Sequence, residues 1–286
     1  EYNHMLNDKA HQGQNSSLRE KYLTFSAAAS NYKAAIPILS RIETDVLGNF
    51  KSLGCDTKVL SGCERLELLY NTFNYDKEPF TFKYDQLVTS DLKTKDFISP
   101  DSFDFSNKSS FEFGNKYGQV LYLKDLPPDL SDKLLSEISD IPVNMLINLH
   151  INSVDQDNAL DLVKKKIAFM EQQKIDEQKK ALKAGYDVDM LPYELKFSLN
   201  EAQELLDDLQ NKNQRMFKAT ILIFTSADSL EDLEKNVYQI SSVARKNNCK
   251  IGKLDYLQEE GMNSSLPLGQ NHIEIQRTLT TSSTAI

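Results

Sequence analysis

The sequence has 286 residues, of which 40% are apolar and 26% are charged, and these are the proportions of a folded globular protein. Its formal net charge of -9 argues against a protein that grips nucleic acid by itself, because such binding depends mostly on cationic side chains at phosphates. Three cysteines are too few for a disulfide scaffold, so we expect reduced thiols, and no apolar run is long enough to cross a bilayer.

Residues 1–116 are expected to form a helical and irregular part, with a connector-like stretch over about the first 20 residues. The apolar pattern predicts a helix over residues 31–53, with Pro37 in its first turn or at a kink. A second helix is predicted over residues 64–73. Further along, the aromatic segments FTFKY and SFEFG are typical of edge or hairpin strands.

Residues 117–258 are predicted to form a βαβ-repeat part. YGQVLYL, VNMLINLHI, FKATILIF and residues 250–257 predict strands, because apolar residues alternate or run continuously in them. Apolar residues at spacings of three and four predict helices at 130–138 and 230–244, and a helical hairpin at 155–213. This order favours an α+β fold: a mixed sheet with ferredoxin-like βαβ units, helices on one face and the hairpin as an insertion.

The sequence contains no motif for binding nucleotides or metals. A phosphate loop needs G-x-x-x-x-G-K-[ST], and the nearest segment, Gly48 to Gly54 around Lys51 and Ser52, has the wrong spacing and lies in a predicted helix. The paired short spacings that zinc requires are missing among His4, His11, His150, His272, Cys55, Cys63 and Cys249. We therefore predict no catalytic, cofactor-binding or metal-binding residue in this chain, and no cofactor.

Other groups have a structural interpretation that is simpler than a chemical one. Cys63 opens a predicted helix, whose N-terminus could lower its pKa, but a buried structural thiol is the simpler interpretation. The acid pairs Asp187 with Asp189 and Asp207 with Asp208 suit a turn and a solvated helix face. A lysine cluster is interspersed with acidic residues, as expected of a solvated helix with ion pairs: Lys164, Lys165, Lys166, Lys174, Lys179, Lys180 and Lys183.

The C-terminal segment LDYLQEEGMNSSLPLGQNHIEIQRTLTTSSTAI resembles the stretch before the motor domain in VirB/TraC/TrbE-type ATPases of conjugative type IV secretion, especially those of Gram-positive conjugative transposons. In that family an L-P-L-G-x-N element precedes an Arg–Thr segment, small hydroxyl residues and an apolar entry to the motor. The corresponding positions here are Leu266, Pro267, Leu268, Gly269 and Asn271, and then Arg277, Thr278, Leu279, Thr280 and Thr281 through Ala285.

Upstream segments resemble the same N-terminal region, in the order GCERLELLYNTFN, TKDFISPDSFDF, YGQVLYLKDLP, GYDVDMLPYEL and NQRMFKATILIF. The likeness covers most of the chain from about residue 20. It implies a non-catalytic assembly or docking part, with residues 259–286 as a linker to a RecA-like motor outside this sequence. ATP and magnesium would bind to that motor, so we expect no enzyme activity here. The chain begins at Glu1, and we expect an excised piece of a longer protein.

The resemblance also implies partners and a location. The partners would be other secretion subunits at the inner face of the cell membrane, and a homo-oligomer is compatible with it; direct nucleic-acid contact is not expected. The chain would be cytoplasmic and would associate peripherally with the membrane through the secretion complex. Candidate contact surfaces are the hairpin and the aromatic segments between Phe80 and Phe113. Two alternatives stay open: a self-contained cytosolic enzyme with dispersed acid or thiol groups, and an unrelated adaptor of similar architecture.

Overall fold

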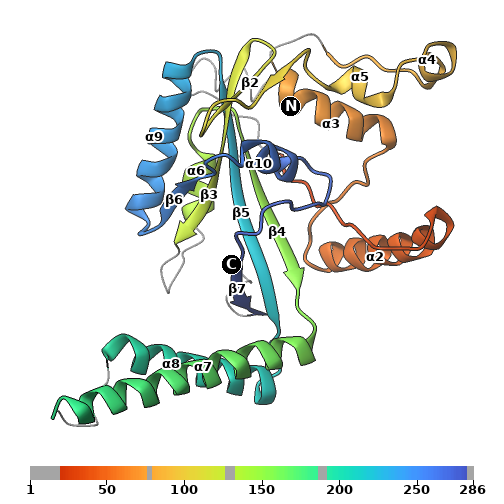
Figure 1. Cartoon of the computed structure of the whole chain (residues 1–286). Coiled ribbons are helices and arrows are strands. Elements are labelled where there is room, and N and C mark those ends of the chain that lie inside the picture. The colour runs from red at the N-terminus through yellow and green to blue at the C-terminus, as the bar shows by residue number, and fades with distance from the viewer. Residues whose placement is uncertain (1–19, 76–78, 126–132, 186–191, 282–286) are drawn as a thin grey trace. The chain divides into compact units, whose positions relative to one another are not determined.

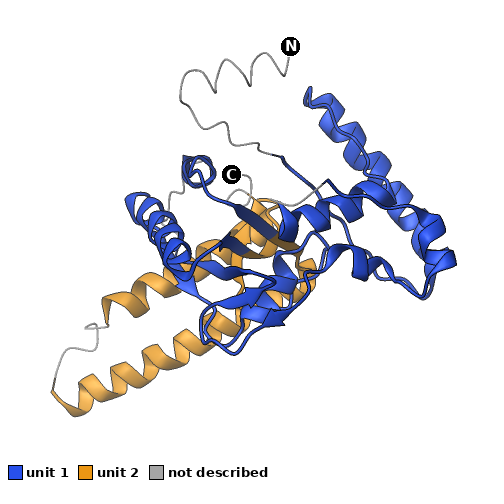
Figure 2. Cartoon of the chain, turned by 90° about the horizontal axis from the view of Figure 1, so that it is seen from above, with its two compact units in different colours: residues 1–149, 221–274 blue, residues 150–220, 275–286 orange. Residues whose placement is uncertain are grey.

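The computed structural model describes residues 20–75, 79–125, 133–185 and 192–281 (Figure 1). The chain divides into two compact units, coloured separately in Figure 2. The first comprises residues 1–149 and 221–274, and the second comprises residues 150–220 and 275–286. The division falls within two long strands, β4 (Met145–Ser153) and β5 (Met216–Ala227).

The sheet of the first unit is built around β3 (Lys116–Asp125). On one side, residues 117–122 of β3 pair with β5. On the other side, its first three residues pair with β2 (Phe111–Phe113) and its last residues pair with β6 (Lys250–Lys253). The short strand β1 (Phe103–Asp104) extends the sheet beyond β2, and β4 extends it beyond β5.

The predicted α+β class is confirmed, but the sheet is antiparallel and not mixed. The reason lies in the two helices that join strands of this unit, α6 (Lys133–Ser139) and α9 (Leu230–Lys246). Helix α6 leads from β3 to β4, which lie on either side of β5, and α9 leads from β5 to β6, which lie on either side of β3. The two strands that α6 joins, and the two that α9 joins, are therefore not neighbours in the sheet.

Both of these helices pack on one face of the sheet. Alternate residues of β3, including Leu121 and Leu123, point to this face and are buried there. The buried residues of α9 recur at spacings of three and four, as the sequence predicts: Leu233, Val237, Ile240 and Ala244. The expected cover of helices on one face therefore holds for α6 and α9.

The opposite face is also covered. Val120 of β3 and Phe224 of β5 lie in a second core with the short helix α10 (Gln258–Ser265) and with Ile273, which follows it. Within residues 259–286, which the sequence predicts to be a linker, Met262 of α10 and Ile273 are therefore packed on the sheet. The polar residues of α10 are buried because their side chains bond to backbone atoms, as Ser265 does to the carbonyl of Gly261 at 2.9 Å.

Among the described residues, four helices come before the first strand in the chain: α2 (Tyr32–Ser52), α3 (Gly62–Asn74), α4 (Tyr84–Thr89) and α5 (Thr94–Ile98). The predicted strand FTFKY does not form, because Phe80 and Phe82 pack their rings on Tyr70 and Phe97 and the chain then enters α4. The predicted boundary at 116/117 does not separate two units, since β2 and β3 pair across it.

The second unit contains the predicted helical hairpin, formed by α7 (Gln156–Lys183) and α8 (Tyr193–Asn211). Its own core includes Val163 of α7, Leu209 of α8 and Met216 of β5. The strand β7 (Arg277–Thr280) pairs antiparallel with residues 216–219 of β5. Gln156 closes the base of the hairpin by donating to the carbonyl of Leu209 at 2.8 Å.

Candidate interaction surfaces

The glycine-flanked segment that most resembles a phosphate loop is the C-terminal end of helix α2. Gly48 lies inside the helix, and Leu53, Gly54 and Cys55 donate their backbone N–H groups to helix carbonyls. A phosphate cradle needs several free N–H groups that converge on one point. Those of these three residues are already used to end the helix.

The three cysteines are free thiols in different surroundings. Cys63 is the second residue of α3, whose N-cap Ser61 forms a capping box with Glu64. Its side chain is half-buried and hydrogen-bonds Tyr84, which raises the pKa of the Tyr84 hydroxyl. Cys249 is buried and donates to the carbonyl of Asn247, while Cys55 is exposed. Cys63 thus contacts a phenol at the N-terminus of a helix.

Those of the histidines and paired carboxylates considered in the sequence that the structure describes do not gather into one site. His150 lies half-buried on β4 and His272 follows α10, whereas His4 and His11 lie outside the described residues, as do Asp187 and Asp189. Asp207 and Asp208 are both ion-paired with Lys212 near the end of α8, at 3.4 and 2.7 Å. In the described part of the chain, no three His, Cys, Asp or Glu side chains are placed to hold a metal ion.

Lys116 is a buried cation that the sequence did not single out. Its side chain is 2% exposed, and its Nζ lies 3.9 Å from the ring centre of Tyr75 and 3.3 Å from Asp228 Oδ1. The carboxylate and the ring face both stabilise a positive charge. Lys116 therefore ties the start of β3 to the ends of α3 and β5, which is a structural role.

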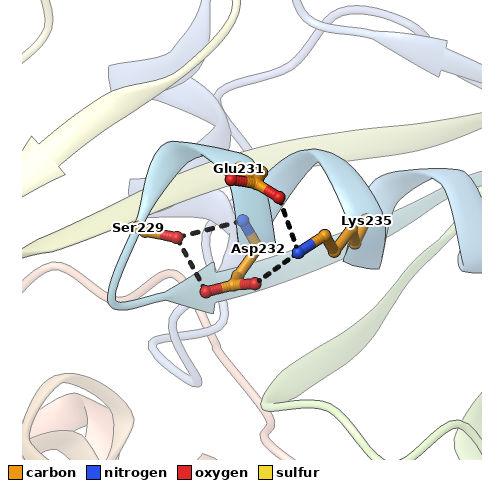
Figure 3. A network of polar contacts seen from close by, with 4 residues as sticks. All are labelled: Ser229, Glu231, Asp232 and Lys235. Carbon is orange, nitrogen blue, oxygen red and sulfur yellow. Dashed lines mark hydrogen bonds and ion pairs between the residues drawn. The ribbon is translucent and has the colours of Figure 1, made fainter.

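The N-terminus of α9 carries the polar network drawn in Figure 3. The hydroxyl of Ser229 accepts from the backbone N–H of Asp232 at 3.1 Å and donates to its carboxylate at 2.7 Å. Lys235 Nζ reaches Glu231 and Asp232 at 2.9 and 3.1 Å. The bond from Ser229, followed by Lys235, lowers the pKa of Asp232. The Ser229 contacts cap the helix, and the pairs of Lys235 join residues one turn apart on its surface.

The lysine cluster lies on α7 and is mostly exposed. Lys179 lies 3.9 Å from Asp176, and Lys180 lies 2.6 Å from Glu177, one helical turn away in each case. Exposed pairs of this kind contribute little to stability and mainly keep the surface hydrated. Lys179 and Lys180 therefore have acidic partners on the same helix, as the sequence predicts for a solvated face.

The hairpin also presents apolar side chains that do not enter its core. Near the turn between its helices, Leu182 is 61% and Tyr193 is 78% exposed, and Phe197 stacks on Tyr193 with ring centres 6.1 Å apart. Leu162 and Phe169 are similarly exposed further along α7. We call Leu182, Tyr193 and Phe197 the hairpin end. The exposure of Leu162 and Phe169 could be predicted from the sequence, because both lie outside the apolar stripe that α7 buries. That stripe consists of Leu160, Val163, Ile167 and Met170.

The aromatic segments between Phe80 and Phe113 are divided between core and surface. Phe111 and Phe113 are fully buried and pack on Phe224 of β5, so they are unavailable to a partner. Tyr84 and Val88 of α4 are largely exposed instead. The predicted aromatic surface is therefore smaller than expected.

No protein-family model matches this sequence, and a search of curated proteins finds no match either. None of the described helices combines the length and the hydropathy that crossing a lipid bilayer requires. A function for this chain is therefore inferred from its sequence motifs and from the chemistry of the surfaces described above.

Proposed function

We propose that the chain is a non-catalytic assembly module of a VirB/TraC/TrbE-type conjugative ATPase. It would hold a RecA-like motor at the cytoplasmic face of the cell membrane by docking on other subunits of the type IV secretion complex. ATP and magnesium would act in the motor and not in this chain. The support from sequence is the L-P-L-G-x-N element at Leu266 to Asn271 and the ordered segments upstream of it.

The observation that carries the docking role is the exposure of the hairpin end. Large apolar side chains in water are favourable sites for association, because covering them releases apolar surface from solvent. Aromatic residues such as Tyr193 and Phe197 are enriched at the centres of protein interfaces. Along α7 and α8 the lysines are interspersed with acidic residues, so the chemistry favours a protein partner over an anionic lipid surface.

The test is a triple variant of the full protein, Leu182→Ser, Tyr193→Ser and Phe197→Ser, in a host that carries the conjugative element. We expect it to fold but to lose co-purification with the secretion complex and to lower the transfer frequency at least about tenfold. The matched control replaces Lys164, Lys165 and Lys166 of the same hairpin with serine. Normal recruitment of the triple variant would refute the docking role.

A second test concerns the proposed motor. A coding sequence with G-x-x-x-x-G-K-[ST] soon after Ile286 is expected, and titration of this chain with Mg·ATP should give no binding signal. Tight magnesium-dependent nucleotide binding by the chain would favour the alternative of a self-contained enzyme.

A further inference from the structure

The outer edge of β4 lacks the proline and the acidic or lysine side chains that often protect a sheet edge. In the part of the chain that the structure describes, β4 is the last strand of the sheet and hydrogen-bonds to β5 on one side. Exposed edges are usually short or carry charges, prolines or bulges, which prevent pairing with another chain. The nine residues of β4, MLINLHINS, include one histidine but no Asp, Glu, Lys, Arg or Pro.

One face of this strand continues an apolar stripe from the core into solvent. Met145 and Ile147 pack against the core under α6 and α9, and Leu149 and Ile151 follow at the same period of two. Leu149 is 45% exposed and Ile151 is 49% exposed. Two large apolar residues at the outer edge of a sheet are stabilised when another strand extends that sheet.

The strand is complementary to itself. An antiparallel pair related by a two-fold axis at Leu149 places Leu149 opposite Leu149 and Ile147 opposite Ile151, all on the apolar face. The other face then pairs Asn148 with His150 and Leu146 with Asn152. Cross-strand pairs of large aliphatic residues stabilise sheets, and this register brings no like charges together.

We propose that this edge pairs with the same edge of a second copy, which joins two sheets into one across a two-fold axis. The interface is isologous, as most homodimer interfaces are. This self-association is independent of the docking role proposed for the hairpin. It assigns β4 as an oligomer contact and Leu149 as the residue on the symmetry axis.

The first test is sedimentation equilibrium of this chain from about 1 to about 100 µM, a range that detects dimers of ordinary strength. The unaltered chain should dimerise, and Leu149→Lys should raise the dissociation constant at least about tenfold, because it places two like charges opposite each other. Leu162→Lys, on an equally exposed leucine of α7, should leave it unchanged. A chain that is monomeric throughout the range, or a Leu149→Lys variant that dimerises normally, overturns the proposal.

A cysteine pair tests the register and does not depend on how well Leu149→Lys folds. In a Cys55→Ser background, Leu149→Cys should form a disulfide-linked dimer under mild oxidation, since directly opposed residues lie within disulfide range. Ile151→Cys is equally exposed but lies about 13 Å from its own copy in this register, and it should crosslink at least about tenfold more slowly. Equal crosslinking of the two variants, or none by Leu149→Cys, would exclude the two-fold at Leu149.

Discussion

The side-chain amide of Gln258 bonds to both backbone groups of Val120. Its Oε1 accepts from the N–H of Val120 at 2.7 Å, and its Nε2 donates to the carbonyl of Val120 at 3.1 Å. Strand β3 pairs with β2 as far as Gly118 and with β6 from Leu121 onward, so Val120 lies where this edge changes partner. The amide of Gln258, 2% exposed, takes the place of a neighbouring strand there.

Replacing this glutamine should destabilise the first unit. Gln258→Leu introduces an apolar side chain of similar size and leaves the N–H and the carbonyl of Val120 buried without these partners. We expect a loss of about 2–4 kcal/mol in the free energy of unfolding, measured by urea denaturation. Gln210→Leu, exposed near the end of α8, should stay within about 0.5 kcal/mol of the unaltered chain. An equal loss in both variants would contradict the role given to Gln258.

Two helical glycines should respond in opposite directions to alanine. A Cβ at Gly261 of α10 would lie 2.6 Å from Leu254 Cδ1 and 3.1 Å from Val120 Cβ, so Gly261→Ala should cost about 1–3 kcal/mol through overpacking. A Cβ at Gly48 of α2 would meet nothing within 4 Å, so Gly48→Ala should stabilise its helix by about 0.5–1 kcal/mol. Thermal unfolding of both variants measures the difference. A stabilising Gly261→Ala would show that α10 does not pack as closely as described.

The elements that the sequence predicts best are those whose burial follows a simple period. Strand β3, strand β5 and helix α9 bury apolar residues at the expected positions, because each has one or both faces in the core. The hairpin is also confirmed, and α8 begins at Tyr193, ahead of its first buried residue, Leu199. The spacing of apolar residues indicates which of them are buried in a core. It does not indicate that Tyr193 and Phe197 are exposed on the surface of α8.

Helix α10 and the segment after it could not be predicted in this way. The helix reads QEEGMNSS, and its buried residues are mostly polar or small, so no apolar stripe marks it. Its burial depends on bonds that only the tertiary structure supplies, such as the backbone N–H of His272 to Ser264 at 2.8 Å. Asn271 accepts from the N–H of Ile273 at 2.9 Å and turns the chain back to the core. The L-P-L-G-x-N element therefore has a structural role in this fold, whatever follows it.

The cap of α9 makes stability depend on pH. The bond from Ser229 and the charge of Lys235 lower the pKa of Asp232 in the folded protein, so its ionised form stabilises the fold. That contribution is complete above the unfolded pKa of about 4 and is lost as the pH falls through the lower folded pKa. Asp232→Asn should therefore lower the urea midpoint at pH 7 and have a smaller effect at pH 2.5.

A double-mutant cycle separates this effect from a general change in the helix. In a Ser229→Ala background the hydroxyl that holds the carboxylate is missing, so the pH dependence of the Asp232→Asn effect should shrink. The urea midpoints of the four proteins at both pH values provide the comparison. A pH dependence that is the same in both backgrounds would mean that Ser229 is not the cause of the lowered pKa.

The hairpin should distinguish its buried leucines from its exposed ones. Leu209 is buried with Val163 and Met216, so Leu209→Ala should leave a cavity that costs about 2–5 kcal/mol. Leu162→Ala, on the exposed side of α7, should change stability by less than about 0.5 kcal/mol. Hydrogen exchange of the α7 and α8 amides is the appropriate measurement, because it reports the second unit separately. Faster exchange in Leu209→Ala alone is expected. Equal protection of the amides from exchange in the two variants would mean that α7 and α8 do not pack through Leu209. The assignment of the hairpin end as a surface for a partner would then lose its structural basis.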